Sequence, residues 1–151
     1  MAKFKGFGEL QNPSDLIKKL EFDFGRLKES ANDQYVAFDF FVTAEHIVDW
    51  IHPNDKEARK AIRSSIPLLK IISHIANGAK HFKATASHHK SIDDIEIDRY
   101  VEAGYVEEGY FEEPIIVKLT SAEAIQFGNS EINVVDLAQL TLTYWQSQNV
   151  T

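Results

Sequence analysis

The sequence predicts one α+β domain of 151 residues that is mainly helical, with a helical bundle over residues 12–87, a loop and antiparallel β-hairpin over 88–132, and a closing helix over 133–148. Two observations carry this prediction. From residue 12 to about residue 82, apolar side chains recur every three or four positions, which is the period of an amphipathic helix. From residue 88 the pattern changes to a short alternation of charged and apolar residues, which favours strands. The bundle is expected to have about four helices, and a chain of this length fits a single domain.

The composition excludes several classes of protein. The chain has no cysteine, which rules out a disulfide framework, a thiolate zinc site and cysteine catalysis. The formal net charge is −7, so binding to nucleic acid would need a local basic patch. The first thirteen residues contain no apolar block long enough for a signal peptide, and no apolar run approaches ~20 residues, so we expect a cytoplasmic protein without membrane contact. Phosphate-cradling, dinucleotide-binding and nucleophile-elbow motifs are missing, and we expect no cofactor.

The first helix is predicted to begin after Asn12. Asn12 is a good N-cap, Pro13 suits the first helical position, and the charge of Asp15 is favourable near the positive end of the helix dipole. Its apolar residues keep helical spacing: Leu16, Ile17, Leu20, Phe24 and Leu27.

The second helix is predicted to start at a Ser30 cap, with Asp33 three residues later as a variant of the capping box, and to end before Pro53. One side of this helix is apolar and comprises Ala37, Phe40, Phe41, Ala44, Ile47, Val48 and Ile51. The opposite side is mixed and comprises Tyr35, Asp39, Val42, His46 and Asp49, flanked by Phe38 and Trp50. A helix with this pattern is expected to lie between two partners or to cover a site.

A short charged helix is predicted over residues 54–66, and another helix is predicted to begin near Pro67. The apolar stripe of the latter comprises Leu68, Leu69, Ile72, Ile75, Ala76, Ala79 and Phe82. On the opposite side, four polar residues lie within about 40° of one line. We call these four the polar ridge: Lys70, His74, Asn77 and His81.

The C-terminal part is predicted to form a hairpin and a helix. The hairpin has one strand through Ile115–Leu119, a turn near residue 121 and a second strand through residues 125–127. The closing helix is capped at Asn133, with Asp136 at the third position. Trp145 in this helix, like Trp50 in the second helix, is expected to anchor the core or a subunit interface.

The polar ridge is the main candidate site. An asparagine and two histidines on one face can bind a phosphate, orient a ribose hydroxyl or move a proton, because histidine titrates near neutral pH. A solvated helix face explains the same pattern more simply. A metal site is an alternative, in which Glu45, His46 and Asp49 meet His74 and His81 between facing helices. The chain has no HExxH motif and no paired ExxH motif, so the main expectation is that it holds no metal.

Two further features have a functional and a simple interpretation. His88 and His89 are expected to be an exposed loop pair. The acidic stretch from Asp93 to residue 113 could imitate a phosphate backbone and bind a basic partner, but a solvated edge or loop is the simpler interpretation. Near its end this stretch contains Glu107, Glu108, Glu112 and Glu113.

Residues 30–82 resemble the HEPN superfamily of small helical-bundle domains, and the resemblance rests on the segment ANGAKHF. Catalytic members carry an arginine, a polar residue directly after it, a few variable residues and then a histidine on a late helix. Here Asn77 takes the polar position, His81 takes the histidine position, and Ala76 stands where the arginine is expected. The resemblance implies a dimeric ribonuclease of toxin–antitoxin or antiphage systems. Without the arginine, the bidentate grip on the phosphate is lost, and Lys70 or Lys80 supplies only a point charge. The wider pattern also resembles small bacterial and phage proteins.

The sequence therefore favours a non-catalytic binding module, linked to phage–host conflict or RNA metabolism, which binds a protein or RNA as a homodimer. Two alternatives stay open: a divergent HEPN-type ribonuclease and a metal-dependent bundle enzyme. In the binding hypothesis the mixed side of the second helix and the polar ridge form one polar groove, comprising Tyr35, Asp39, His46, Asp49, Lys70, His74, Asn77, Lys80 and His81. In the ribonuclease His81 is the acid/base and Asn77 orients the RNA. The metal enzyme uses His46, Asp49, His74 and His81.

Overall fold

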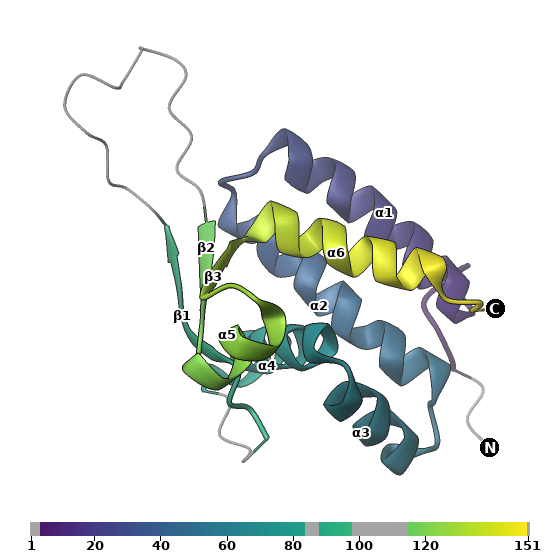
Figure 1. Ribbon diagram of the computed structural model, residues 1–151. Helices are drawn as coiled ribbons and strands as arrows, with labels where there is room; N and C mark the ends of the chain where they lie inside the picture. Colours follow the sequence, from purple (N-terminus) through teal and green to yellow (C-terminus); the bar gives the residue numbers. More distant parts are fainter. Residues whose placement is uncertain (1–3, 84–87, 98–114, 151) are drawn as a thin grey trace.

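The computed structural model describes residues 4–83, 88–97 and 115–150, which form an α+β fold that is mainly helical, as the sequence predicts (Figure 1). In chain order the elements are α1 (Pro13–Glu29), α2 (Gln34–Ile51), α3 (Lys56–Ser65), α4 (Pro67–His81), β1 (Ile92–Ile97), β2 (Ile115–Leu119), α5 (Ser121–Phe127), β3 (Glu131–Asn133) and α6 (Val134–Ser147). Among the helices of these residues, none has both the length and the apolar character that a membrane span requires.

The start of α1 confirms the sequence prediction. The side chain of Asn12 accepts a hydrogen bond of 3.0 Å from the backbone N–H of Asp15, and the Asp15 carboxylate accepts one of 3.2 Å from the N–H of Asn12. This reciprocal capping box satisfies two backbone donors that a helix start would otherwise leave unpaired. The helix packs against α2 and α6 through its predicted apolar residues (Figure 1).

The predicted cap of α2 is wrong by three residues. Asp33, and not Ser30, caps the helix: its carboxylate accepts hydrogen bonds from the N–H groups of Tyr35 and Val36. Ser30 ends α1 instead, since its N–H donates to the carbonyls of Arg26 and Leu27. Because α1 continues to residue 29, Ser30 is already used as a C-cap, and α2 begins three residues later at Asp33.

The core lies where α2 meets α1, α4 and α6. The predicted apolar side of α2 is buried up to Val48, while Ile51 is only partly buried. Trp145 of α6 is 1% exposed, which confirms it as a core anchor, and Trp50 packs against the core from its edge. The apolar side of α4 is broader than predicted, because Ile71 is also fully buried.

The predicted hairpin is wrong in its second strand. β2 does pair in antiparallel fashion, but its neighbours are β1 and β3, and residues 121–127 form the short helix α5. Thr120 caps this helix by accepting the N–H of Glu123, and Gly128 closes it with φ 91°, in the left-handed region that glycine adopts freely. Ile125 is 84% exposed. The capping residues at both ends therefore decide the conformation here, rather than the apolar residues between them.

The sheet closes one end of the bundle (Figure 1). Burial alternates along β2, with Ile115, Val117 and Leu119 buried and the residues between them partly exposed. One face of the sheet therefore packs on the helices, and the other faces solvent. In the described part of the chain β1 lies at an edge of this sheet, and its helix-facing side extends over the junction of α2 and α4.

Candidate functional site

Two pockets flank the place where α2 meets α4, and the side chains of Phe38 and Ala79 line both. The first, of about 410 Å³, lies between α2, α4 and β1, and we call it the apolar pocket. The second, of about 470 Å³, lies between α2, α3 and α4, and we call it the polar groove. The predicted site residues are divided between these two places and other parts of the surface.

The polar groove contains five of the predicted residues: Glu45, His46 and Asp49 of α2, and Asn77 and Lys80 of α4. It also contains Arg63 of α3, which the sequence analysis missed because a short charged helix gives no signal of which charge turns inward. The structure thus brings together part of the mixed side of α2 and part of the polar ridge.

Arg63 binds α3 to α2 through three groups. Its Nε lies 2.5 Å from Oε1 of Glu45, and its Nη2 lies 3.1 Å from Oδ1 of Asp49 and 3.2 Å from the backbone carbonyl of Glu45. Asp49 also lies 3.8 Å from Nδ1 of His46 and 3.6 Å from Nε of Arg59. The guanidinium groups of Arg59 and Arg63 are therefore paired with carboxylates of α2, whereas the exposed Lys80, which also lines the groove, forms no ion pair with a described residue.

The two carboxylates of the groove have opposite pKa shifts. Burial raises the pKa of Glu45 to about 7, and this effect outweighs the lowering by the charge of Arg63. For Asp49, partial burial acts to raise the pKa, but hydrogen bonds and charges from His46 and Arg63 together lower it. Near neutral pH, Glu45 is thus partly protonated beside an ionised Asp49, a pattern found in acid–base sites and also in structural ion-pair networks.

The other residues of the predicted single groove lie elsewhere, so that expectation is wrong in part. Asp39 faces α1, where its carboxylate lies 3.3 Å from Nη1 of Arg26, and Tyr35 is exposed. Nζ of Lys70 lies 3.1 Å from the side-chain oxygen of Gln126 in α5. The reason is geometric: Lys70 and His81 are eleven residues apart, about 16 Å along the helix axis, so one groove across α4 cannot include both ends of the polar ridge.

His74 anchors the start of β1 to α4. Its Nδ1 accepts hydrogen bonds from the backbone N–H groups of Ser91, at 3.2 Å, and Ile92, at 3.1 Å. Burial, followed by the nearby charge of His88, lowers the pKa of His74, which is consistent with a neutral ring acting as acceptor. The ring centroids of His89 and His74 lie 5.3 Å apart, and His89 is half-buried. His88 is exposed as predicted, but His89 is less exposed than predicted.

The residues of the metal alternative do not meet. His46 and Asp49 line the polar groove, His74 lines the apolar pocket, and His81 lines neither. Across residues 4–83, 88–97 and 115–150, no group of three or more histidine, aspartate or glutamate side chains is arranged to hold a metal ion. Residues Glu107, Glu108, Glu112 and Glu113 lie outside the described residues.

The residues of the HEPN-like segment are only partly directed to the polar groove. Ala76, at the arginine position, is 6% exposed and lines the groove. The side-chain amide of Asn77 donates a hydrogen bond of 2.8 Å to the carbonyl of Ser73 in its own helix. His81 is exposed at the last turn of α4. The guanidinium in this region comes from Arg63, and it is already paired with Glu45 and Asp49.

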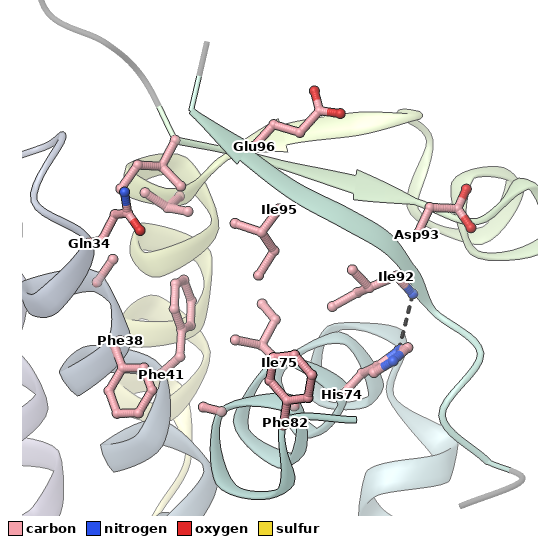
Figure 2. A pocket seen from close by; sticks show the side chains of 15 residues that line it. Gln34, Phe38, Phe41, His74, Ile75, Phe82, Ile92, Asp93, Ile95 and Glu96 are labelled. Atoms are coloured by element: carbon pink, nitrogen blue, oxygen red, sulfur yellow. Dashed lines mark hydrogen bonds between the residues drawn. The ribbon is translucent and has the colours of Figure 1, made fainter. Parts of the chain in front are cut away.

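The apolar pocket is open to solvent beneath β1, and large apolar side chains surround its mouth. Figure 2 shows Ile75 and Phe41 inside the pocket and Ile95 pointing toward them from β1. Phe38 is 54% exposed and Ile95 is 45% exposed, although both line the pocket. The sequence did not predict this pocket, because strands were predicted only for residues 115–119 and 125–127. The alternation in IDDIEI was the available signal of a strand.

A β-bulge turns two isoleucines of β1 toward the pocket. Ile92 pairs with Leu119 and Asp94 pairs with Lys118, so Asp93 is an extra residue on the β1 side. In a regular strand, residues three positions apart point to opposite faces. Because of the extra residue, Ile92 and Ile95 both point to the helix side, as Figure 2 shows.

Phe82 lies at the mouth of the same pocket in a strained turn. The helix α4 ends at His81, so Phe82 leaves the apolar stripe predicted for it and is 89% exposed. Its backbone has φ 66° and ψ −49°, and the N–H of Lys83 donates a hydrogen bond of 2.7 Å to the carbonyl of His81. This is the rare form of γ-turn, which is costly for any residue with a Cβ atom. Strain of this kind is most often retained where a functional surface requires it.

Replacing Phe82 with glycine is expected to give a protein about 1 kcal/mol more stable than the alanine variant at the same position. Both substitutions remove an exposed ring, but only glycine adopts a positive φ without strain. Urea unfolding of Phe82→Gly and Phe82→Ala measures the difference directly. Equal stabilities would show that the turn is not strained in solution.

No protein-family model, curated protein or solved structure matches the chain.

Proposed function

We propose that the protein is a non-catalytic binding module that receives an apolar side chain of a partner protein in the apolar pocket. The observation that carries the proposal is the pocket of about 410 Å³ with Phe38, Phe82 and Ile95 exposed around its mouth. Pockets of about 300–1,000 Å³ are typical of ligand sites. Clustered exposed apolar side chains mark surfaces that a partner covers, because their contact with water is unfavourable.

The backbone at Phe82 supports the same proposal. The strained turn holds a phenyl ring in solvent at the pocket mouth, where it contributes little to the stability of the free protein. A ring in this position gains buried area only when a partner covers it. The strain is then explained by binding rather than by folding.

The charges favour a protein partner over RNA. Among residues 4–83, 88–97 and 115–150, no lysine or arginine lines the apolar pocket, and the charged lining residues are Asp93 and Glu96. Binding of RNA or single-stranded DNA depends on cations that follow the phosphate backbone, even where bases stack on aromatic rings. Together with a net charge of −7, this lining disfavours a nucleic acid at the pocket.

The polar groove supports catalysis less well than the apolar pocket supports binding of a partner. Its guanidinium is paired with two carboxylates, Asn77 is hydrogen-bonded within its own helix, and His81 does not line the groove. A ribonuclease of the HEPN type needs an unpaired cation at the phosphate and a histidine beside it. The binding hypothesis needs neither group.

Selection from a displayed library of random nonapeptides tests the proposal. The wild-type protein is expected to enrich peptides that share one large apolar residue, and Ile95→Asp is expected to abolish this enrichment. Ile125→Asp is the matched control, because Ile125 is 84% exposed on α5 and does not line the pocket. Circular dichroism of both variants verifies their fold.

Two results would contradict the proposal. One is a selection without a shared apolar residue, or one that Ile95→Asp leaves unchanged. The other is degradation of RNA by the wild-type protein that disappears in His81→Ala, which would support the ribonuclease hypothesis instead.

A further inference from the structure

We infer that the partner segment is cationic: lysine or arginine residues flank the apolar side chain that enters the apolar pocket, and the carboxylates of Asp93 and Glu96 bind them. This inference rests on the proposed function and adds the chemical class of the partner. It assigns a role to two residues of β1 that the fold itself does not use.

The rim of the apolar pocket carries charge of one sign. Asp93 and Glu96 line the pocket from β1, and the other lining residues in the described part of the chain include neither lysine nor arginine. His74, the other titratable group of the lining, has a lowered pKa because of burial and the charge of His88. Both carboxylates are exposed, and neither forms an ion pair with a residue of the described ranges. The strand beside the mouth therefore carries two negative charges that no ion pair among the described residues neutralises.

The geometry of β1 puts these charges beside the entry of the pocket. Figure 2 shows Ile92 and Ile95 pointing into the pocket, while the carboxylates of Asp93 and Glu96 point away from it on the same strand. A partner whose apolar side chain enters beneath β1 has its neighbouring residues at the level of that strand. Lysine and arginine have long flexible stems that can reach around the strand to carboxylates on its outer side.

Simple strand addition to β1 is a less suitable mode of binding. β1 is an edge strand, but it contains the bulge at Asp93 and three exposed acidic residues, Asp93, Asp94 and Glu96. Bulges and charges on an edge strand hinder pairing with another strand. The recognition elements of this edge are therefore its side chains: the isoleucines that line the pocket and the carboxylates beside them.

Charge also argues against the segment that follows β1 in this chain as the occupant. Residues 98–114 contain six acidic residues and one basic residue, so they repel the rim of the pocket. A second copy of the chain has the same net charge of −7. A different protein with a basic segment has the complementary charge.

Peptides with matched sequences test the inference. Nine fluorescent nonapeptides carry leucine, phenylalanine or tryptophan at the centre and lysine, serine or glutamate at the four neighbouring positions. Fluorescence anisotropy with the full chain gives their affinities.

Exposed ion pairs are individually weak, so for the best central residue we expect the lysine peptide to bind about ten-fold more tightly than the serine peptide at low salt. The glutamate peptide is expected to be the weakest. Salt of about 0.5 M should remove most of these differences because it screens exposed charges.

Variants of the protein identify the responsible carboxylates. The double variant Asp93→Asn/Glu96→Gln is expected to lose the preference for lysine and to bind the serine peptide as the wild type does. The matched control is Glu9→Gln/Glu57→Gln, which removes the same charge from exposed residues outside the pocket and should retain the preference.

Each outcome separates the inference from the function on which it rests. Equal binding of the lysine, serine and glutamate peptides would overturn the inference and leave the binding function standing. A lysine preference that survives in Asp93→Asn/Glu96→Gln would also overturn it. Failure of all nine peptides at millimolar concentration would contradict the proposed function. Dimerisation of the free protein that Ile95→Asp abolishes would identify a second copy as the occupant and would overturn the inference.

Discussion

Replacing Lys19 with methionine is expected to lower the free energy of unfolding by about 3 kcal/mol, because the substitution leaves a buried carboxylate without its cation. Asp23 of α1 is 1% exposed, and its Oδ2 lies 2.7 Å from Nζ of Lys19. The same ammonium group donates a hydrogen bond of 3.0 Å to Oγ1 of Thr43 in α2. Oδ1 of Asp23 has no hydrogen-bond partner in the described part of the chain, so Lys19 supplies most of the compensation for its burial.

A double variant separates the charge effect from the loss of packing. In Lys19→Met/Asp23→Asn no charge is buried, and we expect it to recover about 2 kcal/mol of the loss. Lys18→Met is the matched control: Lys18 is exposed on the same helix, so its replacement should change stability by less than about 0.5 kcal/mol. Urea unfolding at pH 7 measures all four proteins. A double variant as unstable as Lys19→Met would show that packing, rather than the ion pair, is the origin of the loss.

Replacing Glu45 with glutamine is expected to stabilise the protein above pH 7 and to change little below pH 4.5. Burial raises the pKa of Glu45 from 4.5 to about 7, so between these values the native state keeps a proton that the unfolded state has released. The contribution of Glu45 to the free energy of unfolding is therefore fully present below pH 4.5 and is lost as the pH rises to about 7. A shift of this size corresponds to about 3 kcal/mol. The shift already includes the attraction of Arg63, so we expect the substitution to raise the free energy of unfolding by up to about 3 kcal/mol at pH 8.

The difference between the two proteins isolates Glu45 from other titrating groups. Burial lowers the pKa of His74 and lowers that of His89 to about 4, so these rings make the protein more stable as the pH rises over a similar range. Urea unfolding of wild type and Glu45→Gln between pH 4 and 8 cancels these contributions. Glu57→Gln, an exposed residue of α3, is the control and should follow the wild type at every pH. Parallel curves for Glu45→Gln and wild type would exclude a raised pKa at Glu45.

The helices were predictable because their determinants are local. The capping box of Asn12 and Asp15, the apolar spacing of α2 and the Asn133 cap of α6 all act within a few residues, and the structure has each of them. Even the errors among the helices have local causes. Ser30 already ends α1 and cannot cap α2, and Thr120 with Gly128 folds residues 121–127 as a helix rather than a strand.

The candidate site was less predictable, because the composition of a helix face does not say which element covers it. The sequence placed His46, Asp49, Asn77 and Lys80 on suitable faces, and the structure brings these four together. It gave no reason for Arg63 to enter the same groove from α3, and it assigned His74 to that groove, although His74 anchors β1 on the other side. The polar ridge is about 16 Å long, and several neighbouring elements each contact part of it. This division results from the packing of the elements and cannot be read from the periodicity of the sequence.

The sequence by itself determined the fold class, the starts of α1 and α6 and most of the core-facing residues, since these follow from interactions between residues close in the chain. Tertiary structure alone decided that β2 pairs with β1 and β3, that the bulge at Asp93 turns Ile92 and Ile95 the same way, and that a pocket opens beneath them. The physical reason is that strand pairing joins residues distant in the sequence, and its register depends on the whole core against which the sheet packs.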